Sequence, residues 1–468
     1  MISASHGSWT SPIDVELVSA PSAARPSEPQ LDRGVAYWLE ARPSEGGRVT
    51  LCREGGADVT PGFNVRSRVH EYGGGAYHVN HGVTVFNDLI SGRVHRWGAD
   101  GSVPITPENP AWRYADLRVH PERGLLLAVR EDHSAPGEPV NSIVALSLEG
   151  PNTDGGTPLC LGADFYASPE LSGDGRLAWV EWNHPNMPWD ATLLRVALLT
   201  QGAAGPLLAE PTTVAGGPEE AAGFPLWRKD GALVYVSDRD GWSKPYRAGN
   251  PHPLVNHDAD TVPPLWVFGQ RPWAESADGR LHHAPWQHLG GIAAGGSRVV
   301  FIEGSTDQPP SVVALDVETG RRVTLAGGGA VIESAWVSRG ESITWEGPAG
   351  EVQGWFYPPT NPEFTAPAGD LPPLITMTHG GPTAFADNSF ALRTQFWTSR
   401  GFSVLDVNYS GSAGLGRAYR NRLRGQWGVL DVADVVAGAT ALAERGLVDG
   451  ARLAIRGGSA GGYTTLRA

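Results

Sequence analysis

Residues 457–461, near the end of the chain, read Gly-Gly-Ser-Ala-Gly and directly follow the short apolar run 453–455. A serine in this setting lies on a sharp corner between a strand and a helix, where its backbone is strained and flanking side chains would clash. Gly457 and Gly461 remove that clash. The pattern therefore predicts a strand, a tight corner that exposes Ser459, and a helix.

This corner points to nucleophilic chemistry at Ser459. A serine hydroxyl attacks efficiently only when a base takes its proton. In folds built on this corner the acid and the histidine follow the serine in sequence, but residues 460–468 contain neither Asp nor His. We therefore expect a truncated or partial chain, a fragment that is inactive and poorly folded beyond about residue 340, with an exposed apolar sheet edge.

A second glycine motif begins at residue 378, after the apolar run 374–377, and reads Thr-His-Gly-Gly-Pro. Glycine pairs in this position supply a backbone N–H that stabilises an oxyanion. We expect Gly381 to supply one donor and Ala460 the other. His379 precedes the serine, so we reject it as the base and expect it to shape the loop through hydrogen bonds. The alternative is a turn with an ordinary hydrogen-bonded histidine.

The first 340 residues repeat a hairpin signal. Asp-Gly pairs at 174–175, 230–231 and 278–279 precede apolar or β-branched runs, and looser copies begin at 122 and 296. Asp-Gly forms tight turns, and the spacing suits four-stranded propeller blades. We therefore predict an all-β propeller of six to eight blades over residues 1–340, with an N-terminal extension. A β-sandwich or several unrelated β domains is the alternative, and we place no strands in 250–290.

The pattern changes after residue 350. Apolar runs at 352–357, 374–377 and 402–407 predict strands. A helix is expected to begin at Asp431, with Asp434 at capping-box spacing and Gly446 just past its end. Its predicted apolar face is formed by Val432, Val435, Val436, Ala439 and Leu442. Alternating strands and helices predict a mostly parallel sheet in a second domain, residues 341–468.

Composition narrows the function classes. The net charge of −14 argues against nucleic-acid binding. Cys52 and Cys160 belong to no C-x-x-C pair, and His282 and His283 lack metal-ligand spacing, so we expect no disulfide framework, metal or cofactor. We see no signal-peptide pattern in residues 1–10 and no apolar run of membrane-spanning length. These features lead us to expect a soluble cytoplasmic protein without a membrane partner.

Taken together, several motifs resemble the prolyl oligopeptidase family of serine peptidases, in its acylaminoacyl-peptidase or dipeptidyl-peptidase-like bacterial branch. The motifs lie at residues 379–382, 407–419, 425–434 and 457–463. The resemblance implies a propeller that caps an α/β-hydrolase domain, here incomplete. It also implies peptide hydrolysis by acyl transfer, with short peptides as substrates because the propeller restricts access to the active site. Only Ser459, Gly381 and Ala460 carry over as site residues, since the family's acid and histidine lie beyond the serine.

Other residues leave alternatives open. Glu71, in the run His-Glu-Tyr-Gly-Gly-Gly, could be a buried carboxylate that binds a substrate amino group, although we favour a turn with an ordinary hydrogen-bonded Glu. Arg417 and Arg424 could contact the propeller or a substrate carboxylate, although we favour arginines that are solvated at the surface. Two other functions also remain open: a non-catalytic propeller interaction module with a vestigial hydrolase remnant, and an esterase. The sequence leaves the oligomeric state open.

Overall fold

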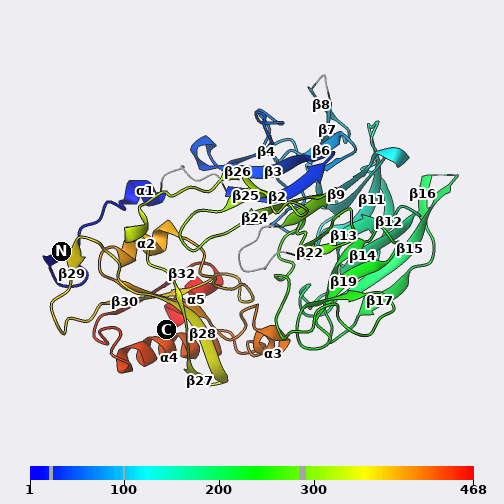
Figure 1. The fold of residues 1–468 in the computed structure, drawn as a ribbon. Coiled ribbons are helices and arrows are strands. Elements are labelled where there is room, and N and C mark those ends of the chain that lie inside the picture. The colour runs from blue at the N-terminus through cyan, green and yellow to red at the C-terminus, as the bar shows by residue number, and fades with distance from the viewer. Residues whose placement is uncertain (20–24, 99–100, 204, 284–290) are drawn as a thin grey trace. The chain divides into compact units, whose positions relative to one another are not determined.

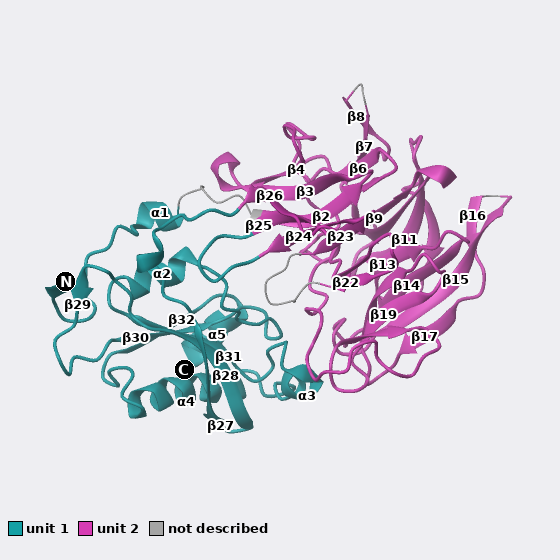
Figure 2. Ribbon diagram, in the orientation of Figure 1, with its two compact units in different colours: residues 1–23, 304–310, 328–468 teal, residues 24–303, 311–327 magenta. Residues whose placement is uncertain are grey.

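The computed structural model describes residues 1–19, 25–98, 101–203, 205–283 and 291–468. The chain forms two compact units, drawn in teal and magenta in Figure 2. Unit 1 contains residues 1–23, 304–310 and 328–468, and unit 2 contains residues 24–303 and 311–327. Unit 1 therefore includes the first 23 residues as well as the segment after residue 340.

Unit 2 is a β-propeller built from consecutive small antiparallel sheets (Figure 1). Within its described residues, six sheets have three to five strands, and a two-stranded sheet precedes the last of them. The predicted range of six to eight blades is confirmed. The first three sheets are β2–β4 (Arg25–Asp32, Val35–Arg42, Arg48–Arg53), β5–β8 (Tyr77–Asn80, Val83–Asn87, Val94–Gly98, Gly101–Pro104) and β9–β12 (Trp112–His120, Leu125–Asp132, Val140–Ser147, Thr157–Cys160).

The remaining sheets continue in chain order around the propeller. They are β13–β17 (Phe165–Leu171, Arg176–Trp182, Leu193–Gly202, Gly205–Leu208, Thr212–Gly216), β18–β20 (Ala222–Trp227, Leu233–Ser237, Lys244–Arg247), β21–β22 (Trp273–Glu275, Leu281–His283) and β23–β26 (Ile292–Gly295, Arg298–Glu303, Ser311–Asp316, Arg322–Gly327). Between residues 250 and 290, where we placed no strand, the described residues contain β21 and β22. Residues 284–290 lie outside the described part.

The predicted Asp-Gly turns join the first two strands of three sheets. Gly175, Gly231 and Gly279 have φ angles of 92°, 77° and 80°, in the left-handed region that glycine adopts without strain. In the second turn the carboxylate of Asp230 accepts a hydrogen bond of 3.0 Å from the N–H of Ala232. The local chemistry that the sequence predicts for these hairpins is confirmed.

The first sheet of the propeller packs against the last, which closes the ring. Strand β2 lies beside β23 and β24, and the side chains of Trp38, Val300 and Ile302 share one buried core. Arg298 forms an ion pair of 2.7 Å with Glu54 across this junction. Closure therefore combines apolar burial with a charge pair between residues far apart in sequence.

Unit 1 contains a five-stranded sheet in the order β27-β28-β31-β30-β32. Its strands are Glu341–Gly347, Gly350–Tyr357, Ser403–Asn408, Leu374–Thr378 and Leu453–Gly457, in that spatial order. β30 pairs in parallel with β31 and β32, whereas β27–β28 and β28–β31 are antiparallel. The sheet is therefore mixed rather than mostly parallel, because β27 and β28 form a hairpin.

Unit 1 contains five α-helices among its described residues, including those expected after Asp431 and after Ser459. They are α1 (Val15–Ser19), α2 (Leu392–Thr398), α3 (Gly416–Asn421), α4 (Leu430–Glu444) and α5 (Ala460–Arg467). None of the helices in the described ranges is both long and apolar enough to cross a bilayer. One edge of the sheet is β32, where Leu453 is 45% exposed.

Helix α4 corrects two predictions. Asp431 does not begin the helix as a capping residue; it lies inside α4, and its carboxylate accepts a hydrogen bond of 2.6 Å from the N–H of Gly428. The buried face consists of Asp431, Asp434, Val435, Gly438 and Leu442, while the predicted Val436 is 49% exposed. Two carboxylates thus occupy a face that an apolar pattern could not reveal.

The N-terminal segment completes unit 1. Strand β1 (Ile2–Ser3) pairs in parallel with β29 (Phe364–Thr365). The N–H of His6 donates a hydrogen bond of 2.7 Å to Asp370. Residues 2–6 and 364–370 therefore belong to one folded body although the propeller lies between them in sequence.

Candidate active site

Ser459 lies on the corner between β32 and α5 that the sequence predicts. Its φ and ψ angles are 52° and −121°, a conformation that non-glycine residues rarely adopt. A side chain on Gly457 would collide with the hydroxyl of Thr378, and one on Gly461 would collide with the carbonyl of Thr378. The two glycines of the motif are therefore required by close packing around the strained serine.

The glycine loop after β30 lies directly beside this serine. A Cβ placed on Gly380 would be 3.1 Å from the carbonyl oxygen of Gly458 and 3.4 Å from the Cβ of Ser459. The next residue, Gly381, has a φ angle of 59°. Ala460 is the first residue of α5, where backbone N–H groups have no partner within the helix. The structure thus brings Ser459 and the loop together, while the oxyanion roles of Gly381 and Ala460 stay predictions.

Thr378 is a positioning residue that the sequence reasoning missed. Its side chain is buried, and its hydroxyl lies 2.8 Å from the carbonyl oxygen of Gly461 and 3.2 Å from the hydroxyl of Thr465. It therefore links the end of β30 to the first turns of α5. A threonine directly before His379 is a weak signal, because only the folded corner shows what it contacts.

His379 shapes the loop and is not placed as a base. Its Nε2 lies 2.7 Å from the hydroxyl of Ser412, its Nδ1 lies 3.1 Å from the carbonyl of Gly380, and its ring stacks on Tyr409 with centroids 4.3 Å apart. Burial lowers the pKa of His379 to about 4. The neutral imidazole is thus committed to local hydrogen bonds, as the sequence led us to expect.

Helix α5 is held in place by a buried carboxylate. The hydroxyl of Thr464 on α5 donates a hydrogen bond of 2.5 Å to Asp431 on α4. Asp434, one turn further along α4, accepts a hydrogen bond of 2.7 Å from the N–H of Ser410. These bonds connect the helix behind the serine to α4 and to the loop after β31.

Three other predictions are resolved by burial. Glu71 is not buried: its side chain is 74% exposed and pairs with Arg113 at 2.7 Å, which agrees with the favoured turn interpretation. Arg417 is 8% exposed, so its predicted solvation is wrong, whereas Arg424 is exposed.

Among the described residues, no group of three or more His, Cys, Asp or Glu side chains is arranged to hold a metal ion.

Comparison with known proteins bears directly on this corner. The model of the prolyl oligopeptidase family matches residues 388–468, which include Ser459. A puromycin-hydrolyzing peptidase of Mycobacterium tuberculosis is 38% identical over 100% of this chain and 78% of its own length, with a TM-score of 0.93. The chain belongs to the prolyl oligopeptidase family.

Two further relatives support the prolyl oligopeptidase assignment. A puromycin hydrolase mutant, solved in complex with PGG, is 36% identical over 99% of this chain and 78% of its own length, with a TM-score of 0.92. Dipeptidyl peptidase family member 6 of Caenorhabditis elegans is 37% identical over 93 residues, 20% of this chain and 13% of that protein. The match therefore spans far less than two thirds of this curated relative.

Proposed function

We propose that Ser459 is the nucleophile of a serine peptidase that cleaves short peptides by acyl transfer. The observation that carries this proposal is the strained serine, with a φ angle of 52°, beside the Gly380 backbone. A hydroxyl held on such a corner is aimed at one point in space, as an attacking group requires.

The proposed oxyanion donors are the backbone N–H groups of Gly381 and Ala460. Both belong to segments that flank Ser459, and the N-terminus of α5 adds a favourable dipole for a negative oxygen. Each such donor typically contributes about 3 kcal/mol to transition-state stabilisation. In this scheme the Ser459 oxygen bonds to the peptide carbonyl carbon, and the hydroxyl proton passes through solvent to the leaving nitrogen. The C–N bond then breaks, the amine departs, and water hydrolyses the acyl-enzyme to the free acid and Ser459.

The proposed substrates are short peptides, and the propeller is proposed to exclude larger polypeptides. Membership of a peptidase family supports this choice, as do the similarities to a puromycin-hydrolyzing peptidase and to a puromycin hydrolase solved with PGG. Hydrolysis rates that fall steeply as a peptide substrate is lengthened would support the size limit.

We also propose that the 468-residue chain alone hydrolyses peptides very slowly. Among the described residues, no His or carboxylate is hydrogen-bonded to the Ser459 hydroxyl, and His379 is engaged elsewhere. An oxyanion hole without a base still accelerates acyl transfer by roughly three orders of magnitude over water. Slow acylation by an activated ester should therefore remain measurable.

The experiment is acylation of the chain by p-nitrophenyl acetate, followed by mass spectrometry of the digested protein. We expect one acetyl group on Ser459, and none at that peptide in the matched Ser459→Ala variant. Acetylation of both proteins at equal rates would contradict the proposal and favour a non-catalytic propeller module.

A further inference from the structure

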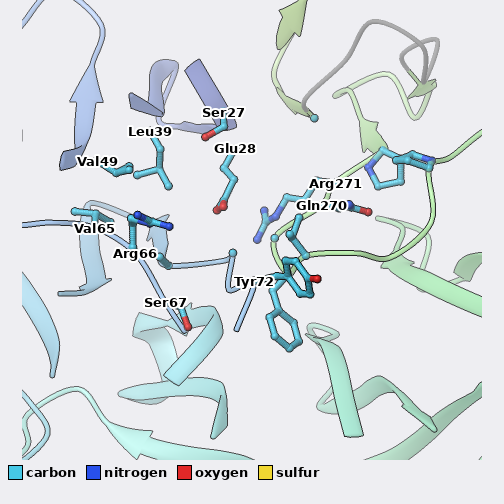
Figure 3. Close-up of a pocket in the computed structure, with 18 residues that line it drawn as sticks. Ser27, Glu28, Leu39, Val49, Val65, Arg66, Ser67, Tyr72, Gln270 and Arg271 are labelled. Atoms are coloured by element: carbon cyan, nitrogen blue, oxygen red, sulfur yellow. The ribbon is translucent and has the colours of Figure 1, made fainter. Parts of the chain in front are cut away.

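The propeller contains a cavity of about 380 Å³ inside unit 2, shown in Figure 3. Its walls come from β2, which supplies Glu28, and from two segments at residues 65–76 and 263–272. Apolar side chains of Leu39, Val49 and Val65 line one part of it. The volume lies within the range of small-molecule sites, which combine an apolar lining with a few polar groups.

One of those polar groups is the guanidinium of Arg271, one nitrogen of which has no hydrogen-bond partner among the described residues. Arg271 lines this cavity and a neighbouring one of about 270 Å³. Its Nη2 is buried, and it donates no hydrogen bond to any described residue. Burial and the nearby Arg118 lower the pKa of Arg271. A buried N–H group without an acceptor is costly, so the Nη2 of Arg271 is available to donate to an anionic ligand.

Two carboxylates that act electrostatically on Arg271, those of Asp116 and Glu170, already pair with another cation. Arg118 pairs with Asp116 at 2.9 Å and with Glu170 at 2.6 Å. Glu28 points toward Arg271 across the cavity in Figure 3, yet the two do not form an ion pair. Space for a ligand group therefore remains between an unpaired arginine and a carboxyl group.

Glu28 is compatible with an anion at this position. Its Oε1 accepts a hydrogen bond of 3.2 Å from the N–H of Gly75. Burial raises the pKa of Glu28 to about 7, so a substantial share of the group is protonated at neutral pH. A protonated carboxyl group can donate a hydrogen bond to a ligand oxygen instead of repelling it.

The residue next to Arg271 adds an acceptor. Gln270 also lines both cavities, and its Oε1 is buried with no hydrogen-bond partner within the described ranges. A carbonyl oxygen of this kind needs an N–H group from the ligand. A carboxylate with an amide N–H on the adjacent carbon supplies both missing partners.

We propose that this cavity binds the carboxylate of an N-acylated amino acid or of a peptide C-terminus. The carboxylate lies on the guanidinium of Arg271, and the adjacent amide N–H donates to Gln270. An apolar side chain packs against the Leu39, Val49 and Val65 wall. The site belongs to the propeller alone and does not depend on the proposed chemistry of Ser459.

The test is calorimetric titration of the 468-residue chain with N-acetyl-leucine. We expect binding that weakens at least about tenfold when the probe is N-acetyl-leucinamide, which lacks the charge, because charge-assisted hydrogen bonds to arginine are strong. Isocaproate, which keeps the carboxylate but lacks the amide, should bind less tightly than N-acetyl-leucine. If isocaproate binds as tightly as N-acetyl-leucine, Gln270 does not recognise the amide. The proposed specificity for an acylated amino acid or a peptide C-terminus would then be wrong, because any small carboxylate would fit the site.

Matched variants locate the site. Arg271→Met should abolish binding, whereas Arg66→Met, which removes an exposed arginine of the same cavity, should weaken it only a few-fold. Ser459→Ala should bind N-acetyl-leucine as the parent does, which separates this site from the proposed nucleophile. Undiminished binding by a folded Arg271→Met variant, or equal affinity for acid and amide probes, would overturn the proposal. If the methionine variant does not fold, Arg271→Lys replaces it in this test. This variant keeps the positive charge but loses the planar guanidinium, so it should bind N-acetyl-leucine more weakly than the parent.

Discussion

Each unit of the molecule buries a charged side chain, and the two are treated in opposite ways. In unit 1, the carboxylate of Asp431 accepts hydrogen bonds from the Gly428 N–H and the Thr464 hydroxyl. In unit 2, Arg271 has a buried nitrogen with no partner in the described part of the chain. A fully bonded charge acts as scaffold, whereas an unbonded one keeps its capacity for a ligand. Whether a buried charged group has hydrogen-bond partners therefore distinguishes a structural polar group from a functional one, with no sequence motif needed.

The largest expected effect comes from removing the scaffold charge. Asp431→Ala should lower the free energy of unfolding by roughly 4 kcal/mol, because it leaves the buried N–H of Gly428 without its acceptor and removes the short hydrogen bond of the buried Thr464 hydroxyl. Urea denaturation monitored by circular dichroism measures this loss. Asp431→Asn is the control: it keeps an acceptor oxygen and should lose clearly less stability. A loss of unfolding free energy below about 1 kcal/mol in the alanine variant would contradict the structural role that we assign to Asp431.

Glu28 should make the stability of the propeller depend on pH. Burial raises its pKa from the ordinary 4.5 to about 7, so the folded protein binds this proton more tightly than the unfolded chain does. The sign follows: stability from this group is full below about pH 4.5 and falls as pH rises toward about 7. The total loss is on the order of 3 kcal/mol.

The matched variant for this pH effect is Glu28→Gln, which stays neutral. The difference in unfolding free energy between variant and parent should shift in favour of the variant as pH rises from 5 to 8. Taking this difference cancels other titrating groups, including Asp406 of unit 1, whose pKa burial also raises to about 7. A difference that stays constant with pH would show that Glu28 is already ionised in the folded protein.

The smallest expected effect has the opposite sign to the first. Arg271→Met should leave the melting temperature unchanged or raise it, by the equivalent of about 1 kcal/mol, because a buried charge without a partner is replaced by an apolar group of similar length. Differential scanning calorimetry without added ligand measures it. A marked loss of stability would show that Arg271 is part of the scaffold, and the contrast between the units would disappear.

Local signals in the sequence predicted local geometry well. The Gly-x-Ser-x-Gly motif predicted the corner at Ser459, because the glycines and the strained serine are neighbours in sequence. The Asp-Gly turns were predictable for the same reason. Helix α4 was located correctly, but its buried face was not: Asp431 and Asp434 are buried because hydrogen-bond donors from distant segments reach them.

The propeller cavity could not be predicted from sequence. Glu28, Arg66 and Arg271 come from segments far apart in the chain, and no periodicity marks them as neighbours. Glu71, in a conspicuous motif, drew attention as a candidate buried carboxylate and is exposed, whereas Glu28, in an unremarked strand, is the carboxyl group that lines the cavity and is partly buried there. Burial of a charged residue is a property of the assembled ring.

The pairing of Ile2 with Phe364 has a consequence for biosynthesis. Strand β1 must wait for a partner that is made after the whole propeller, because β1 and β29 lie on either side of it in the chain. The propeller can close its own ring earlier, once β23 and β24 are available to β2. Unit 2 is therefore expected to mature first during translation, while β1 stays unpaired until β29 has been made.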